Sequence, residues 1–182
     1  MAHSHTRALV LAALCTALGV VLPMTVHAIP QGGQILLPMH LPVLLCGLTC
    51  GGPLGLLCGV LTPLLSHFAT GMPPSPVLPA MVCELAAYGL ISGLLARRLH
   101  TGRRTRDLYL QLVLSMLLGR AVYGAMNALV FSPGSYTLSA FVAAAFVTAL
   151  TGILLQLALL PPLVLLLEKA RLIDAQPVEK KK

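Results

Sequence analysis

The chain has 182 residues, of which 57% are hydrophobic and 9% charged, and its formal net charge is +7. At a mean hydropathy of +0.90, its polar residues are too few to cover a single soluble core, so most of its surface must face lipid. The positive charge does not indicate nucleic-acid binding, because the basic residues flank apolar runs and no aromatic residues alternate with them to stack on bases.

Apolar runs dominate the chain, and about 20 mostly apolar residues cross a membrane as a helix. The sequence predicts an all-α membrane protein, a single domain over residues 1–182 with six transmembrane helices. The expected helices are 7–26, 37–50, 53–70, 76–97, 108–131 and 138–168, and a basic tail follows at 169–182. The second and third are short because Gly51-Gly52-Pro53 permits a tight reversal between them, and Pro161-Pro162 should kink the last.

Basic residues predict the orientation. Arg7, the segment 97–106 and the tail all fall on one side of a six-span chain, whereas 27–36, 71–75 and 132–137 carry no charge. The positive-inside rule therefore places both termini in the cytoplasm.

The first run has a second interpretation. Residues 1–28 have a basic start, an apolar centre and Val26-His27-Ala28, which is similar to a signal-peptide cleavage site. Cleavage would leave five spans. A lipoprotein signal at Cys15 is disfavoured because Leu14 is too bulky for the position before a lipidated cysteine. We expect the first helix to be retained.

The five cysteines lie in apolar stretches, and an odd, buried set is not a disulfide framework. Cys46 and Cys50 are four residues apart, but no histidine or carboxylate is suitably spaced to complete a metal site. We expect no metal and no cofactor.

The first helix carries two pairs of small residues at four-residue spacing, Ala8 with Ala12 and Ala13 with Ala17. Such pairs let another helix approach closely in lipid. The pattern alone does not decide between a helix of this chain and a helix of another protein.

The segment 28–34 is uncharged and rich in glycine and amide groups. It lacks the Gly-Lys-Ser/Thr ending of a phosphate-binding loop. We expect a lid at the outer face, with Gln31, Gly32 and Gly33 in the lid and Gln34 as a ligand contact, although an ordinary connector has the same composition.

Two histidines are candidate ligand contacts. His40 lies between Pro38 and Pro42, whose freed backbone groups must be buried in protein or line a wet cavity. His67 lies near the outer end of the third predicted helix, where a histidine is more often an interfacial residue.

The fourth and fifth predicted helices carry the sharpest polar pattern. Glu84 and Tyr88 share one helix face, and Arg120 shares another with Tyr123 and Asn127. Ionisable residues inside a membrane are costly and indicate function. Glu84 and Arg120 either pair to hold the bundle together or leave the arginine partly free to bind a carboxylate or ring acceptor.

Two other classes of protein remain open from the residues alone. A standalone channel or facilitator would need a continuous polar lining, but polar residues become sparse toward the inner ends of the helices. A small intramembrane enzyme would use Glu84 or His67 as acid or base, and no convincing catalytic partner is apparent for either.

Four segments follow a small-residue first helix and a Gly-Gln loop in a characteristic order. They are Leu37-Pro38-Met39-His40-Leu41-Pro42-Val43-Leu44, Pro63-Leu64-Leu65-Ser66, Thr70-Gly71-Met72-Pro73-Pro74 and Met81-Val82-Cys83-Glu84-Leu85-Ala86-Ala87-Tyr88-Gly89. In this order the chain resembles, over nearly its whole length, the S-components of energy-coupling factor (ECF) vitamin transporters of prokaryotic plasma membranes.

The resemblance implies a six-helix subunit, not an enzyme, that binds one vitamin or precursor from outside beneath the loop after its first helix. It implies docking on a transmembrane coupling subunit through an alanine surface, here Ala8, Ala12, Ala13 and Ala17. Two cytoplasmic ATPase subunits would supply the energy, and the S-component would topple in the membrane to release its cargo.

The resemblance does not identify the vitamin. A free Arg120 suits the carboxylate of pantothenate, whereas an Arg120 neutralised by Glu84 suits a pyridoxine-like or pyrimidine ring. Biotin, riboflavin and thiamine fit less well, the last two because a chain without Trp has few large aromatic faces.

Overall fold

The computed structural model describes residues 2–26, 32–131 and 137–173, and every regular element in this part of the chain is a helix. The elements are α1 (Ala2–Val26), α2 (Gly32–Leu36), α3 (His40–Cys50), α4 (Gly52–Thr70), α5 (Leu78–Arg98), α6 (Arg104–Met126), η1 (Asn127–Phe131), α7 (Leu138–Val142), η2 (Ala143–Thr148) and α8 (Leu150–Lys169). Six stretches within them are long and apolar enough to cross a membrane. The predicted all-α protein with six membrane helices is confirmed.

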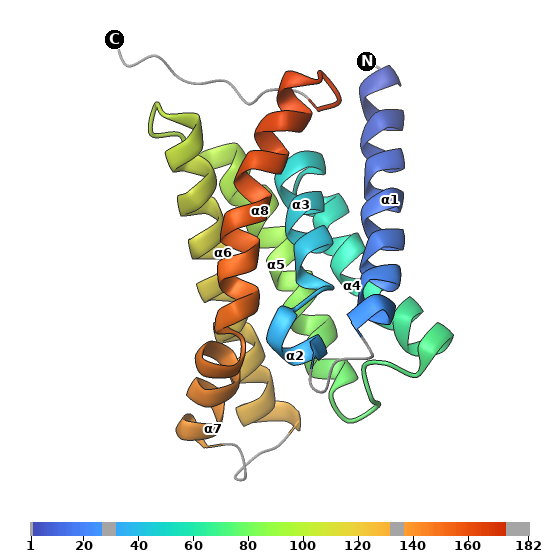
Figure 1. The fold of residues 1–182 in the computed structure, drawn as a ribbon, viewed down its shortest axis with the longest axis vertical. Helices are drawn as coiled ribbons and strands as arrows, with labels where there is room; N and C mark the ends of the chain where they lie inside the picture. The colour runs from blue at the N-terminus through green and yellow to red at the C-terminus, as the bar shows by residue number, and fades with distance from the viewer. Residues whose placement is uncertain (1, 27–31, 132–136, 174–182) are drawn as a thin grey trace.

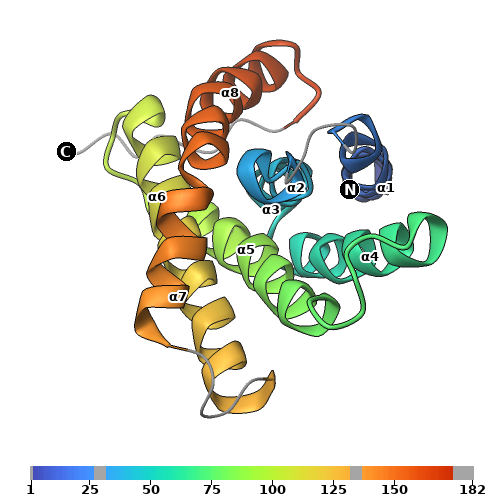
Figure 2. The same ribbon diagram turned by 60° about the horizontal axis from the view of Figure 1, so that its bottom comes forward.

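Helix α3 lies at the centre of the bundle, with α1, α4, α5 and α8 around it (Figures 1 and 2). Most of its residues are buried, and Val43, Leu44 and Cys46 have no exposed surface at all. The outward faces of α1, α4 and α6 instead expose large apolar side chains, as expected of helices that meet lipid.

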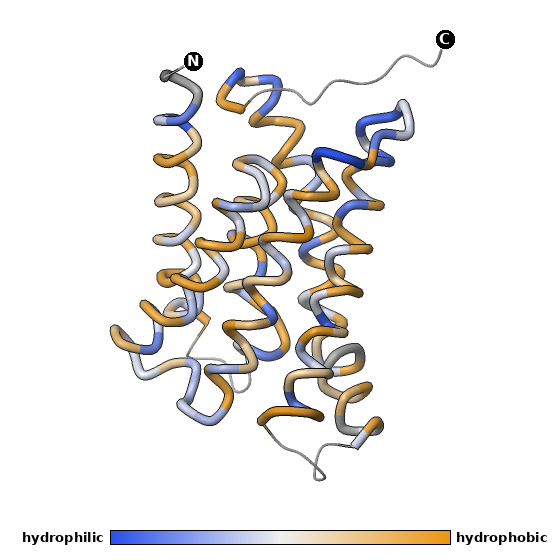
Figure 3. The backbone as a smooth tube through the Cα atoms, turned by 180° about the vertical axis from the view of Figure 1, so that it is seen from behind, coloured by the Kyte–Doolittle hydropathy of each residue, from blue (hydrophilic) through white to orange (hydrophobic). Residues whose placement is uncertain are grey.

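Charged residues gather at the end of the bundle where α1 begins and α8 ends (Figures 1 and 3). There Arg104 donates to Glu168 Oε1 from Nε at 2.9 Å and from Nη2 at 2.5 Å, which ties the start of α6 to the end of α8. The buried Asp107 accepts from the backbone N–H of Thr101 at 2.9 Å and also from its hydroxyl. These bonds fix the connection between α5 and α6.

Helices α4 and α5 pack backbone to backbone through glycines. A Cβ added at Gly55 would lie 2.2 Å from the carbonyl oxygen of Gly89, and one at Gly89 would lie 2.0 Å from that of Gly55. Gly59 meets the Leu85 carbonyl and Gly93 meets the Gly52 nitrogen at similarly short range. We call the five glycines of this contact the glycine interlock: Gly52, Gly55, Gly59, Gly89 and Gly93. It holds α4 and α5 closer than any side chain would allow.

The last apolar run is divided rather than continuous. Where one helix was expected over 138–168, the chain forms α7, then the π-helix η2, and only then α8, whose span begins at Leu150. The composition stays apolar across η2, so hydropathy carries no sign of the break. Helix α8 continues through both Pro161 and Pro162.

The described part of the predicted lid is a short helix. Gly32, Gly33 and Gln34 begin α2, which presses on α8 so closely that a Cβ at Gly152 would lie 2.8 Å from the Ile35 carbonyl oxygen. Tertiary packing thus overrides the poor helix propensity of glycine. Gln31, the other predicted lid residue, lies outside the described residues.

Candidate ligand-binding site

A cavity of about 510 Å³ lies toward the end of the bundle opposite to the one where Arg104 and Glu168 pair. Its walls come from the end of α1, from α2, the start of α3, the α4–α5 connection, α5, α6 and η2. A volume of 300–1,000 Å³ is typical of small-molecule sites. The two backbone interruptions of this half, the α2–α3 junction and η2, both contribute to the cavity wall.

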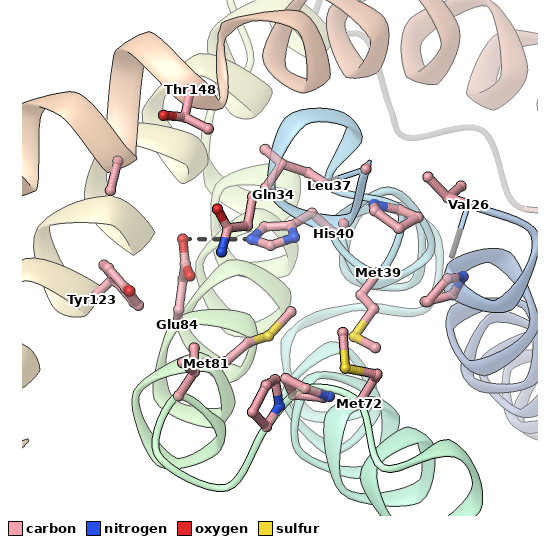
Figure 4. Close-up of a pocket in the computed structure, with 18 of the residues that line it drawn as sticks. Val26, Gln34, Leu37, Met39, His40, Met72, Met81, Glu84, Tyr123 and Thr148 are labelled. Atoms are coloured by element: carbon pink, nitrogen blue, oxygen red, sulfur yellow. Dashed lines mark ion pairs between the residues drawn. The ribbon is translucent and has the colours of Figure 1, made fainter. Parts of the chain in front are cut away.

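The cavity wall is mostly apolar, with polar groups on one side of it. The polar lining residues among those described are Gln34, His40, Thr70, Glu84, Arg120, Tyr123 and Thr148. Four methionines contribute soft, adaptable surface: Met24, Met39, Met72 and Met81. Figure 4 shows Thr148, Tyr123 and Glu84 on one side and the thioethers of Met39 and Met72 on the other. The cavity is therefore amphipathic.

Three buried ionisable side chains from three helices meet at one carboxylate oxygen. Glu84 Oε1 on α5 lies 3.3 Å from Arg120 Nη1 on α6 and 3.5 Å from His40 Nε2 at the start of α3. Glu84 and His40 are each 3% exposed and Arg120 is 6% exposed. Of the two alternatives left open by the sequence, the structure has the pairing of Glu84 with Arg120, and the pair lines the cavity as well as joining two helices.

Small residues bring these helices within reach of each other. A Cβ at Gly119 would lie 2.8 Å from Tyr88 Cδ1, so α6 approaches α5 closely one residue before Arg120. Tyr88 is 1% exposed, and its ring meets that of His40 edge-on at a centroid distance of 5.1 Å. Tyr88 thus packs against the ionisable cluster through the ring of His40 and does not itself line the cavity.

Polar atoms of this cluster are buried without hydrogen-bond partners in the described part of the chain. They include both ring nitrogens of His40, Glu84 Oε1, and Nε and Nη2 of Arg120. Because a buried unsatisfied donor costs about 1–3 kcal/mol, and more when charged, a ligand that supplied acceptors here would recover that free energy. Such orphaned groups at a cavity are a reason to regard it as a binding site.

Some of the other predicted site residues line the cavity and some do not. Gln34, Gly32, Gly33 and Tyr123 line the cavity. Asn127 and His67 do not. The side-chain amide of Asn127 donates to the Tyr123 carbonyl at 2.9 Å, and His67 Nδ1 lies 2.7 Å from the Pro73 carbonyl oxygen, where it fixes the α4–α5 connection.

The four alanines of α1 also lie on different faces. Ala12 is buried against the bundle in line with Cys15 and Gly19, and Ala8 is half-buried. Ala13 and Ala17 are exposed beside Leu14 and Val21. Ala12 packs within the chain, whereas Ala13 and Ala17 are open to a neighbour.

Sequence reasoning missed several lining residues. Thr148 lies in an apolar run without any polar periodicity, and Ala144 offers no chemical signal at all. Thr70 and Met72 belong to the segment Thr70-Gly71-Met72-Pro73-Pro74, which indicates an uncharged outer connection and a family resemblance but no ligand contact. The spacing of methionines in the sequence could have suggested an adaptable apolar surface but not its location.

Six membrane-crossing helices around an amphipathic cavity with buried, unsatisfied polar groups define a multi-pass membrane protein with a site for a small molecule. The model of one family, described as the ECF transporter, substrate-specific component, matches residues 7–164. The chain belongs to this family, as its resemblance predicted. It is therefore a substrate-specific transport subunit of the ECF type and not an enzyme.

Comparisons with curated proteins and with solved structures gave no match.

Proposed function

We propose that the chain is the high-affinity substrate-binding subunit of an ECF-type importer, and that the cavity between α1, α3, α5 and α6 holds a small water-soluble vitamin or its precursor. The observation that carries the proposal is the cluster of Glu84, Arg120 and His40 in the cavity wall. Several of its buried polar atoms have no hydrogen-bond partner among the described residues, which is costly unless a ligand supplies one.

The charged end of the bundle supports a cytoplasmic position for both termini in a prokaryotic plasma membrane. The exposed basic residues Arg97, Arg98, Arg103, Arg106 and Lys169 all belong to this end. Under the positive-inside rule the cavity then opens toward the outside. A ligand would enter past α2 and the end of α1, and Gly33 and Gln34 of α2 would close over it.

Two ligand classes agree with the cavity. Pantothenate would place its carboxylate against Arg120, and a pyridoxine-like or pyrimidine compound would place a ring between Arg120 and Glu84. Both are small enough for a cavity of about 510 Å³.

Energy would come from partner subunits, a transmembrane coupling subunit and two cytoplasmic ATPases. Ala13 and Ala17 on the exposed face of α1 form the surface on which we propose that the coupling subunit docks. Small residues at four-residue spacing allow two helices in lipid to approach closely enough for extensive van der Waals contact.

Replacing Ala13 by tryptophan should therefore abolish vitamin uptake while ligand binding by the isolated subunit stays within about twofold of wild type. The measurements are uptake of radiolabelled vitamin by cells that express the whole transporter and co-purification of the coupling subunit. Leu118→Trp is the matched control. It places the same bulky side chain on another exposed helix face, because Leu118 is 48% exposed and belongs to α6 rather than α1. Unchanged assembly of the Ala13→Trp variant would rule out this docking surface.

Native mass spectrometry of the detergent-purified chain tests the binding function itself. Protein from cells grown on rich medium should carry an adduct with the mass of a vitamin or precursor, because a high-affinity site retains its ligand through purification. If no adduct appears and no member of a B-vitamin panel binds in calorimetry, the proposed function is wrong.

A further inference from the structure

The charges in the cavity wall already balance. Among the described residues of the six spans, Glu84 and Arg120 are the ionisable carboxylate and guanidinium that line the cavity, and they lie 3.3 Å apart. The other side chains with polar atoms beside them are His40 from α3, Tyr88 from α5 and Tyr123 from α6. The carboxylate of Glu84 and the guanidinium of Arg120 therefore already neutralise each other, so the ligand need not bring a charge for either.

The Nε and Nη2 atoms of Arg120 indicate the first group that the ligand must offer. Nη1 faces Glu84, which leaves the Nε and Nη2 edge without a partner among the described residues. The same edge of Arg104 engages Glu168 at the other end of the bundle. This edge presents two parallel N–H donors, which match a planar group with one or two acceptor atoms.

Glu84 indicates the second group that the ligand must offer. Its carboxylate accepts hydrogen bonds, and Oε1 has none from the described residues although two cationic or potentially cationic groups lie near it. A ligand that meets both residues must thus offer an acceptor to Arg120 beside a donor to Glu84. A carboxylate offers acceptors alone, and it would add a second negative charge beside Glu84 in a buried site.

Resting on the proposed function, we propose that the ligand is a planar heterocycle without net charge, with an acceptor and a donor on adjacent positions. The acceptor faces the Nε and Nη2 edge of Arg120, and the donor faces Glu84. The methylene and methyl groups of the ring lie toward Met39, Met72 and Met81, whose thioethers adapt to an irregular apolar outline.

The test compares neutral rings with carboxylates on the detergent-purified full chain by isothermal titration calorimetry. The probes are pyridoxine and an aminopyrimidine with a hydroxymethyl group on one side, and pantothenate and nicotinate on the other. Wild type should bind one of the rings at least about 100-fold more tightly than either carboxylate, because a site built for a donor–acceptor pair rejects a ligand that leaves its polar groups unpaired.

Glu84→Gln should reverse the preference. The variant keeps the size of the side chain but leaves the charge of Arg120 without its neutralising partner, so affinity for the ring should fall and affinity for pantothenate should rise, each by about tenfold or more. Glu168→Gln is the matched control. It removes the acid of the other arginine–glutamate pair, at the far end of the bundle, and should change neither affinity.

The outcomes separate this inference from the proposed function. If a carboxylate binds wild type best, or if Glu84→Gln binds ligand without any change of preference, the inference is wrong and the binding function stands. If no vitamin binds wild type at all, the proposed function itself is wrong. Should Glu84→Gln not fold, the comparison of probes on wild type still decides.

Discussion

Arg120→Ala is expected to lower ligand affinity by at least about 100-fold, which corresponds to about 2.7 kcal/mol. The change removes the guanidinium proposed to meet the ligand and also takes from the buried Glu84 the cationic partner that lies 3.3 Å away. Calorimetry with the ligand found by mass spectrometry measures the loss. The variant should remain monodisperse in detergent, because α5 and α6 also pack through Gly119 and Tyr88.

Two further variants show whether the effect belongs to the cavity. Arg120→Lys keeps the charge beside Glu84 but not the planar fork, and it should lose affinity by about tenfold or more. Arg106→Ala lies on the same helix at the charged end, where Arg106 bonds Thr101, and it should bind as wild type. Wild-type affinity in Arg120→Ala would remove Arg120 from the binding site.

Gly55→Ala is expected to destabilise the protein by about 3 kcal/mol or more. The new Cβ would lie 2.2 Å from the carbonyl oxygen of Gly89 and 2.8 Å from the Cα of Gly47, and both are backbone atoms that cannot rotate away. Helices α4 and α5 must therefore separate. The measurement is the unfolding temperature followed with a thiol-reactive dye, because Cys46 and Cys58 are 0% and 1% exposed until the chain unfolds.

Gly33→Ala is the matched control for stability. No atom lies within 4 Å of a Cβ at Gly33, and alanine favours the helix by up to about 1 kcal/mol over glycine. Its unfolding temperature should equal or exceed that of wild type. Equal unfolding temperatures for Gly55→Ala and wild type would show that α4 and α5 do not approach as closely as described.

The fold was predictable because the membrane constrains it so strongly. Two signals locate the six spans without any knowledge of packing. Charged residues are nearly absent from the apolar runs, and glycine and proline mark the breaks between them. The pairing of Glu84 with Arg120 was one of two alternatives that the sequence left open, because isolated charges in apolar sequence need either each other or a ligand.

Other parts of the site depend on contacts that no local pattern encodes. Thr148 reaches the cavity because η2 interrupts an otherwise uniform apolar run, and Gly32 and Gly33 become helical because α2 presses on Gly152. The histidines had similar sequence settings, yet His40 joined the cavity and His67 bonded Pro73. Here the three-dimensional neighbours decide, and the sequence gives only candidates.

The glycine interlock has a consequence for how fast ligand is exchanged. Because backbone atoms of α4 and α5 are in direct contact, these helices cannot slide or tilt relative to each other without losing that contact, and the cavity wall that carries Glu84 moves as one body with them. We expect the opening to come instead from the wall where the short α2 rests on α8 and meets the end of α1. We therefore expect the α2 side of the cavity to set the rates of ligand capture and release, with α4 and α5 staying fixed as it opens and closes.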